Sequence, residues 1–264
     1  MLLILCDFDG TIANSEKKFY SILKSFVRDK IPESIIDLDK FTEDFYYKNC
    51  LGKKYYESFK TLGAHNIIDY SKVTEAHLNT FLDYLTVELD KVKEGEITFT
   101  TGMKEFLEKI SKEKNLKFVI DTNARLSDFL SKSKPLNSDF IKEVTKNKNV
   151  YSVSDIKKDF KYLNLEKYKT SCKPNPAVFM NAIEDLKNKN YEFENIIIIE
   201  DSPSAVKGGK NFKETEYAKN FKEIKIVGYT AGDHKPDGKT LTENGADIII
   251  DNAEDLFNFI KKYN

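Results

Sequence analysis

The chain opens with a short apolar run that ends in a pair of acidic residues. Residues 1–6 are all apolar. A run of this length is too short to span a membrane and predicts a buried β-strand. Asp7 and Asp9 follow it, with Gly10 and Thr11 next in the chain. Ligands of open α/β sheets bind beyond the carboxyl ends of the strands, so we expect chemistry at this point. A solvated Asp-Gly turn is the structural alternative.

Three later segments carry polar groups in comparable positions. They are the strand Leu116 to Asp121 followed by Thr122-Asn123, the helix start Lys173-Pro174-Asn175-Pro176, and the strand Asn195 to Ile199 followed by Glu200-Asp201-Ser202. Taken singly, each has an ordinary structural explanation: a turn after a strand, proline in the first turn of a helix, or an N-cap. Taken together, their order and spacing fit one chemical task.

These four segments resemble the ordered signature motifs of the haloacid dehalogenase-like superfamily of phosphotransferases, and the resemblance extends over essentially the whole chain. It implies an α/β fold, with a Rossmann-like parallel sheet core flanked by helices and an inserted α-helical cap. Alternating strands and helices independently favour a parallel sheet with helices on both faces. The further strands that we expect are residues 149–153, 196–199, 224–228 and 247–250.

Phosphoryl chemistry explains why these residue types are needed together. A phosphate monoester is doubly negative and repels an anionic nucleophile unless cations lie beside it. Mg²⁺ prefers oxygen ligands, and Asp7, Asp201 and Glu200 offer them. The resemblance adds the backbone carbonyl of Asp9 as a metal ligand. Lys173 supplies a compact positive charge for the phosphoryl oxygens and the nucleophile.

Other groups at the same strand ends are expected to bind the phosphoryl group. Thr122 donates a hydroxyl hydrogen bond, and the amide of Asn123 orients the group. Backbone N–H groups around Gly10 and Thr11 form an anion-binding nest. Gly10 permits the backbone conformation that such a loop requires.

The expected mechanism uses the two carboxylates of the first motif in different roles. Asp7 attacks phosphorus in line and forms an aspartyl-phosphate. Asp9 protonates the leaving alcohol and then accepts a proton from the water that hydrolyses the intermediate. The predicted catalytic residues are therefore Asp7, Asp9, Thr122 and Lys173.

Helical periodicity between the first and second motifs predicts an inserted domain. The segments 15–30 and 73–89 show apolar residues at helical spacing. We expect a core of residues 1–14 and 95–264 and a helical cap, similar to the C1-type caps of the superfamily, of residues 15–94. The Lys- and Asn-rich stretch 131–149 is expected to be irregular.

Substrate selection is expected in the cap. Residues 51–54 are similar to the Gly-containing loop by which such caps reach the active site. Lys53 is a candidate for binding an anionic substrate, and Arg125, which follows the second motif, is a candidate for the entrance. A solvated charged face is the alternative for Lys53, and exposure to solvent is the alternative for Arg125.

Differences between branches of the superfamily narrow the reaction class. Asp9 argues against a dehalogenase and against phosphonoacetaldehyde hydrolase-like members. Phe19 stands near the place where β-phosphoglucomutase-like members usually carry a His. We therefore expect a Mg²⁺-dependent phosphatase acting on small phosphorylated metabolites. The loop Gly228 to His234 resembles sugar-phosphatase-like members, which favours sugar phosphates, although His234 itself has no assignable role. The alternatives are a sugar phosphomutase or a non-catalytic ligand-binding member.

Composition agrees with a water-soluble enzyme. Lys and Arg number 42 and Asp and Glu 43, which gives a net charge of −1, so nothing indicates nucleic-acid binding. The three cysteines are widely spaced, without a disulfide framework or metal-binding spacing. The opening apolar run ends in acidic residues rather than a cleavage site, so we expect no membrane association and a cytoplasmic location. A monomer is the default expectation.

Overall fold

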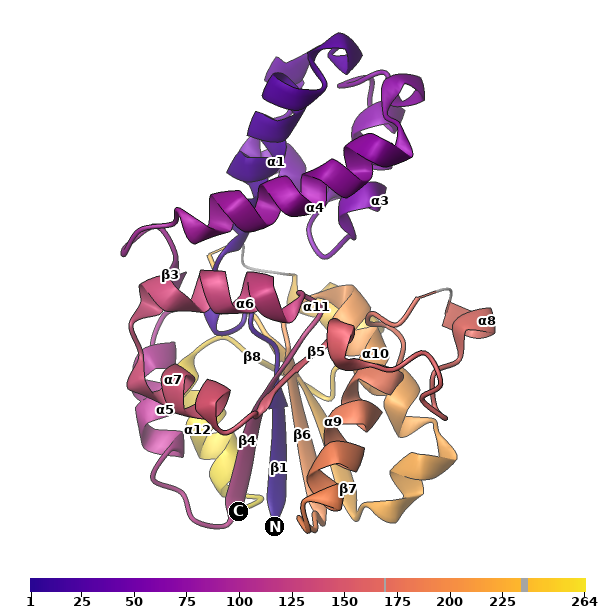
Figure 1. Cartoon of the computed structure of the whole chain (residues 1–264). Coiled ribbons are helices and arrows are strands. Elements are labelled where there is room, and N and C mark those ends of the chain that lie inside the picture. Colours follow the sequence, from indigo (N-terminus) through magenta and orange to yellow (C-terminus); the bar gives the residue numbers. More distant parts are fainter. Residues whose placement is uncertain (169, 234–236) are drawn as a thin grey trace.

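The computed structural model describes residues 1–168, 170–233 and 237–264. Its central sheet has six strands: β1 (Leu2–Cys6), β4 (Leu116–Thr122), β5 (Val150–Ser152), β6 (Asn195–Glu200), β7 (Glu223–Tyr229) and β8 (Ile248–Ile250). They lie in the order β5-β4-β1-β6-β7-β8, with all neighbouring pairs parallel. The fold is therefore the expected α/β sheet flanked by helices (Figure 1).

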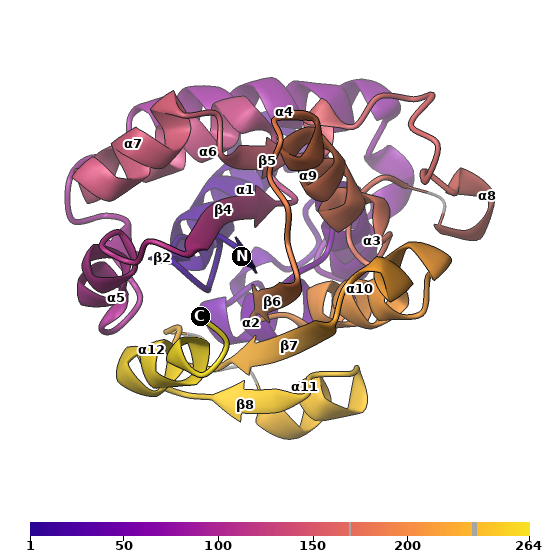
Figure 2. The same cartoon turned by 90° about the horizontal axis from the view of Figure 1, so that it is seen from below.

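Helices cover both faces of the sheet. They are α5 (Met103–Ile110), α6 (Leu126–Ser133), α7 (Asp139–Lys146), α9 (Ala177–Asn188), α10 (Pro203–Lys213), α11 (Gly238–Glu243) and α12 (Ala253–Lys261). The short helix α8 (Leu165–Tyr168) has no buried residue and lies away from the sheet (Figure 1). Because side chains alternate along β1, Leu2, Ile4 and Cys6 pack in one core with α5, α6, α7 and α12. Leu3 and Leu5 pack in the other core, under α9 and α10. Figure 2 shows these two layers on either side of the strands.

A separate group of helices lies over the carboxyl ends of the strands (Figure 1). These helices are α1 (Glu16–Lys30), α2 (Glu43–Asn49), α3 (Tyr55–Ala64) and α4 (Glu75–Asp90). They pack around a hydrophobic cluster of their own, which includes Phe26, Phe59 and Phe81. The chain enters and leaves this group through the antiparallel pair β2 (Ala13–Asn14) and β3 (Thr98–Phe99). The insertion is thus joined to the sheet by two adjacent strands.

Short 3₁₀ helices complete the secondary structure, at Pro32–Ser34, Leu38–Lys40, Tyr70–Lys72, Lys134–Leu136, Val153–Asp155 and Glu216–Asn220. The stretch 131–149 was expected to be irregular, and this expectation is wrong. It contains α7, whose Ile141 and Val144 are buried against the sheet. The apolar residues of α7 recur at helical spacing, which outweighs the Lys- and Asn-rich composition. Among the described helices, none combines the length and the apolar character that a membrane span needs.

Candidate active site

Strand register brings three acidic residues into one row. β1 lies between β4 and β6, in the register Cys6↔Ile120 and Cys6↔Ile199. The residue that follows Cys6, Ile120 and Ile199 is acidic in each case: Asp7, Asp121 and Glu200. Side chains two positions earlier, Leu5, Val119 and Ile198, pack in the core under α9. Because side chains alternate along a strand, the three carboxylates face the same side of the sheet.

Lys173, just before α9, inserts its ammonium group into this row. Its Nζ lies 3.0 Å from Asp7 Oδ1, 2.7 Å from Glu200 Oε1 and 3.2 Å from Asp121 Oδ1. It also donates a hydrogen bond of 2.7 Å to the backbone carbonyl of Asp121. Burial opposes the charged form of Lys173, but Asp7, Glu200 and Asp121 outweigh it and raise the pKa of Lys173 well above its usual value. The lysine is therefore a fixed cation at the end of the central strand.

The negative charge at this place exceeds the positive charge of Lys173. Asp7, Glu200 and Asp201 each offer a carboxylate oxygen, and these oxygens lie within 4.8 Å of one another. Burial raises the pKa of Asp7 to about 7 and raises the pKa of Glu200 well above its usual value, although Lys173 lowers both. A buried group of carboxylates is costly without a further cation. The oxygen-only donor set is the type that suits Mg²⁺, so the residues present fit a divalent ion of this class.

Asp9 lies outside this acidic group and has partners of its own. Its carboxylate accepts hydrogen bonds from the Ser15 hydroxyl and, at both oxygens, from the Lys132 ammonium. Lys132 belongs to α6 and is buried. The backbone carbonyl of Asp9, expected as a metal ligand, is a different atom, and its role stays a prediction.

The loop after Asp9 is a tight turn. Gly10 has a φ of 80°, which favours glycine, and its N–H donates to the carbonyl of Ala13 at 2.8 Å. Thr11 is fully buried, and its carbonyl accepts a hydrogen bond from the Thr100 hydroxyl. Neither Gly10 nor Thr11 is among the described residues that line the cavity at this site. A phosphate role for the Gly10 amide would require that its bond to Ala13 open.

Asn123 of the second motif holds the backbone of Lys173. The side-chain oxygen of Asn123 accepts a hydrogen bond of 2.9 Å from the Lys173 backbone N–H. Thr122 is buried, and its hydroxyl oxygen accepts from the Ala124 N–H at 3.1 Å. Asn123 lines the cavity, whereas Thr122 is not among its described lining residues. The structure thus brings Asn123 to the site at least partly as an anchor for Lys173.

A cavity of about 630 Å³ opens between the sheet and the inserted helices. Its floor includes Asp7, Asp9, Asn123, Lys173 and Asp201, and its roof includes Phe19, Tyr46, Leu51 to Tyr56, Leu82 and Leu85. This volume lies within the usual range for small-molecule sites, and it exceeds what inorganic phosphate alone would fill. The site therefore has room for an organic group on the phosphate.

The loop of residues 51–54 lines the cavity. Gly52, at φ 70°, lies against Ser202, since a Cβ built on Gly52 would be 3.5 Å from the Ser202 Cβ. Lys53 lines the cavity and donates a hydrogen bond of 3.0 Å to the Thr61 hydroxyl. The loop of residues 51–54 and the loop after β6 therefore lie in contact beside the acidic group.

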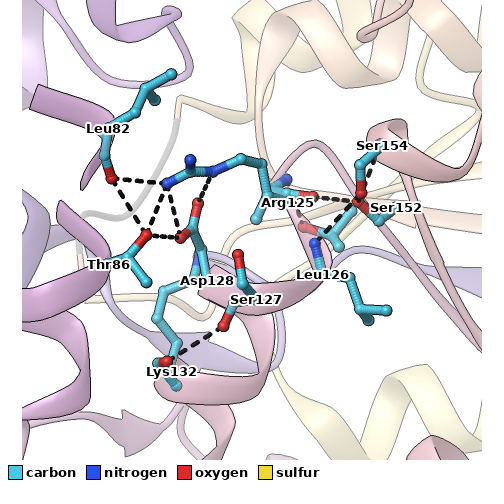
Figure 3. A network of polar contacts seen from close by, with 12 residues as sticks. Leu82, Thr86, Arg125, Leu126, Ser127, Asp128, Lys132, Ser152 and Ser154 are labelled. Atoms are coloured by element: carbon cyan, nitrogen blue, oxygen red, sulfur yellow. Dashed lines mark hydrogen bonds and ion pairs between the residues drawn. The ribbon is translucent and has the colours of Figure 1, made fainter. Parts of the chain in front are cut away.

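Arg125 lines the same cavity, but its guanidinium is engaged at the boundary with α4 (Figure 3). Its Nε and Nη2 donate to the two Asp128 oxygens at 2.8 and 3.0 Å. Nη2 also donates to the Leu82 carbonyl at 2.8 Å and to the Thr86 hydroxyl at 2.9 Å. Leu82 and Thr86 belong to α4, so Arg125 joins the inserted helices to α6.

Asp121, Lys132 and Glu16 are charged residues of the site that no motif in the sequence predicts. Glu16 lines the cavity and accepts a hydrogen bond of 2.6 Å from the Tyr46 hydroxyl. Burial raises the pKa of Glu16 to about 7, with Asp9 as the next cause. Of these three residues, Asp121 alone has a distinctive sequence context, because it is an acidic residue at the end of an apolar strand. His234 lies outside the described residues.

The fold and the site together define a class: an α/β protein with an acidic, lysine-containing site at the carboxyl edge of a parallel sheet, covered by inserted helices. The chain belongs to the haloacid dehalogenase-like hydrolase family, whose sequence profile matches residues 1–213. No curated protein matches the sequence.

Solved structures show the same fold at low sequence identity. A haloacid dehalogenase-like protein of unknown function from Agrobacterium tumefaciens is 15% identical, with a TM-score of 0.66 and coverage of 99% of this chain and 98% of that one. A candidate β-phosphoglucomutase from Thermotoga maritima is 20% identical, with a TM-score of 0.61 and 99% coverage of both chains. CbbY from Rhodobacter sphaeroides, in complex with phosphate, is 14% identical, with a TM-score of 0.65 and coverage of 96% and 95%.

Proposed function

We propose that this hydrolase is a Mg²⁺-dependent phosphatase that acts on small phosphorylated metabolites through an aspartyl-phosphate on Asp7. The observation that carries the proposal is the position of Asp7. Its carboxylate lies 3.0 Å from the Lys173 ammonium, within the acidic group that includes Asp201, and on the floor of a cavity larger than phosphate. A nucleophile, a fixed cation and a cation-binding group thus meet where a phosphate would enter.

In the proposed mechanism, an Asp7 oxygen attacks phosphorus while the ester oxygen leaves. Lys173 neutralises charge on the nucleophile and on the phosphoryl oxygens. Asp9 gives its proton to the leaving oxygen, then takes a proton from the water that attacks the aspartyl-phosphate, so that phosphate is released and Asp7 is restored. Asp7, Glu200 and Asp201 would hold Mg²⁺, with the Asp9 carbonyl as a further ligand. The ion would supply positive charge beside the phosphoryl oxygens.

We further propose that residues 15–94 form a cap domain that selects the substrate. The cap supplies most of the cavity roof, including aromatic side chains and the loop of residues 51–54. Sugar phosphates are the preferred substrate class, on the resemblance of the Gly228 loop to that of sugar phosphatases. Phe19 lines the cavity and has no group that transfers protons, which favours hydrolysis over a mutase reaction.

The test is phosphate release with Mg²⁺ from p-nitrophenyl phosphate and from a panel of phosphorylated metabolites. We expect metal-dependent release by the wild type, abolished by chelation. Asp7→Asn should lower the rate by about 10³-fold or more, because the nucleophile is lost.

Asp139→Asn is the matched control, since the Asp139 side chain is fully exposed on α7. Mass spectrometry of the Asp7→Asn protein should exclude deamidation of the introduced asparagine back to aspartate. Wild-type rates in Asp7→Asn would overturn the proposed nucleophile. A wild type that releases no phosphate from any compound would overturn the phosphatase.

A further inference from the structure

Lys132 is a buried cation that the mechanism above does not use. It lies on α6, far in sequence from the first motif, and only 10% of its side chain is exposed. An ammonium group is costly to bury unless it is paired. Its ion-pair partner is the carboxylate of Asp9, which it contacts through both oxygens. The position of one side chain is therefore coupled to that of the other.

The loop that carries Asp9 is packed directly against α6. The rings of Phe8 and Phe129 meet edge to face, with centroids 4.8 Å apart. Phe129 and Lys132 are three residues apart on α6, so they lie on the same side of the helix. Lys132 Nζ lies 5.8 Å from the centroid of the Phe8 ring. The same helix face thus packs on Phe8 and reaches its neighbour Asp9.

The rest of α6 is held by polar contacts to the cap. Arg125 and Asp128 contact Thr86 on α4, and the Ser131 hydroxyl donates to Asp90 at the end of α4 (Figure 3 shows the first of these groups). Asp128 and Ser131 are buried. The backbone that carries Lys132 is therefore fixed on two sides, by the Phe8 loop and by the cap.

The contacts also distinguish the two oxygens of Asp9. Oδ1 accepts hydrogen bonds from both Ser15 and Lys132, whereas Oδ2 accepts one from Lys132. Oδ2 is therefore the less crowded of the two oxygens. The Asp9 side chain is 21% exposed and lines the cavity, so its carboxylate can reach a bound substrate.

We propose that Lys132 is a positioning residue, which fixes the carboxylate of Asp9 for proton transfer to and from the substrate. This proposal rests on the proposed phosphatase function. Without Lys132, Asp9 would keep only the Ser15 hydroxyl and would be free to rotate. Correct placement of an acid–base group contributes about 10²- to 10⁴-fold to a rate, so misplacement should be costly only where a proton is needed.

The test compares two phosphate esters whose leaving groups differ in how much they need a proton. The phenolate of p-nitrophenyl phosphate leaves readily without a proton, whereas that of phenyl phosphate leaves poorly. For Lys132→Met we expect kcat/KM to fall about 10-fold more for phenyl phosphate than for p-nitrophenyl phosphate. Lys134→Met, at an exposed lysine two residues away, is the control and should change neither. If Lys132→Met does not fold, Lys132→Gln should show the same selective loss.

A double-mutant cycle separates positioning from direct substrate binding. In an Asp9→Asn background, Lys132→Met should change kcat/KM for phenyl phosphate less than about 2-fold, because its effect passes through Asp9. An equal loss for both esters, or a full effect of Lys132→Met in the Asp9→Asn background, would overturn the proposal. Such a result would make Lys132 a substrate-binding or purely structural residue. A wild type inactive on both esters would instead overturn the phosphatase, and this role with it.

Discussion

Lys173 and Arg125 both join segments that are distant in sequence, but their surroundings differ in charge. Lys173 has ion-pair contacts with three carboxylates, and Asp201 lies beside two of them. Arg125 meets one carboxylate, that of Asp128, together with a backbone carbonyl and a hydroxyl (Figure 3). Negative charge is in excess around Lys173 and balanced around Arg125.

This is the difference that we expect between a ligand-binding site and a purely structural contact. A buried network whose donors and acceptors are matched is complete without any further partner. A buried network with surplus carboxylates is favourable only when cations or protons are added. Burial is the main cause that raises the pKa of Asp7 and of Glu200, and neighbouring carboxylates, Asp201 for Asp7 and Asp7 for Glu200, raise them further. We therefore expect substitutions in the two networks to have different consequences.

The largest effect is expected from Lys173→Met, which removes the cation and leaves its carboxylates unpaired. We expect kcat to fall by about 10³-fold, since charge stabilisation of this kind is worth several kcal/mol. Steady-state kinetics on p-nitrophenyl phosphate measures this loss. Lys189→Met, at an exposed lysine after α9, should behave as the wild type. Retention of more than about a tenth of the activity would contradict the assigned role.

Metal binding should stabilise the acidic group and leave the Arg125 network unchanged. At a Mg²⁺ concentration about 100 times the Kd, the free energy of unfolding should rise by about 2.7 kcal/mol. Thermal or urea unfolding with and without Mg²⁺ measures this shift without an activity assay. Asp201→Asn should lose most of the shift, and Arg125→Met should keep it. The prediction fails if Mg²⁺ has no effect on the wild type or stabilises Asp201→Asn equally.

Arg125→Met should lower stability without removing the cation-binding group. The buried Asp128 carboxylate would lose its ion pair, at a cost of about 2 kcal/mol in the free energy of unfolding. Urea unfolding measures this cost. Thr86→Val, which removes a single hydroxyl on the α4 side, should cost about 1 kcal/mol. An Arg125→Met protein as stable as the wild type would show that the Arg125 contacts contribute nothing to the free energy of unfolding.

The smallest effect is expected at Glu16, and it depends on pH. Burial raises the pKa of Glu16 from 4.5 to about 7, so the folded state holds this proton more tightly than the unfolded state. Stability from this group is complete below pH 4.5 and is lost as the pH rises through 7. Because Glu16 is only partly buried, Glu16→Gln should gain about 1 kcal/mol over the wild type at about pH 8.

Urea unfolding of both proteins at about pH 4 and about pH 8 tests this prediction. Gln keeps an oxygen that can accept the Tyr46 hydrogen bond, so the comparison isolates the charge. A constant difference between the two proteins across this pH range would mean that Glu16 does not titrate with the shifted pKa.

Sequence patterns predicted the parts of the fold and site that depend on local order. Apolar runs ending in polar residues placed Asp7 and Glu200 at strand ends, and parallel pairing then brings such ends together. Helical spacing predicted α1 and α4 within one or two residues. These features follow from short-range sequence patterns, so they can be predicted without knowing how distant segments pack.

The remaining residues depend on packing between distant segments. Lys132 is one of many lysines in the chain, and it reaches Asp9 because α6 packs through Phe129 on Phe8 and is held by polar contacts to α4. Asp121 belongs to an apolar strand, and which face it occupies follows from the sheet register. Arg125 follows the second motif directly, yet its guanidinium binds Asp128 in the first turn of α6 and Thr86 on α4. No local pattern encodes these choices.

The backbone of three neighbouring strands sets the spacing of Asp7, Asp121 and Glu200. Neighbouring parallel strands are about 4.8 Å apart, and this spacing is fixed by main-chain hydrogen bonds that do not depend on the side chains above them. Each of the three positions can therefore exchange its side chain while the distance between attachment points stays the same. The side chains at this edge can change by substitution, whereas the distances between their Cα atoms are set by the sheet.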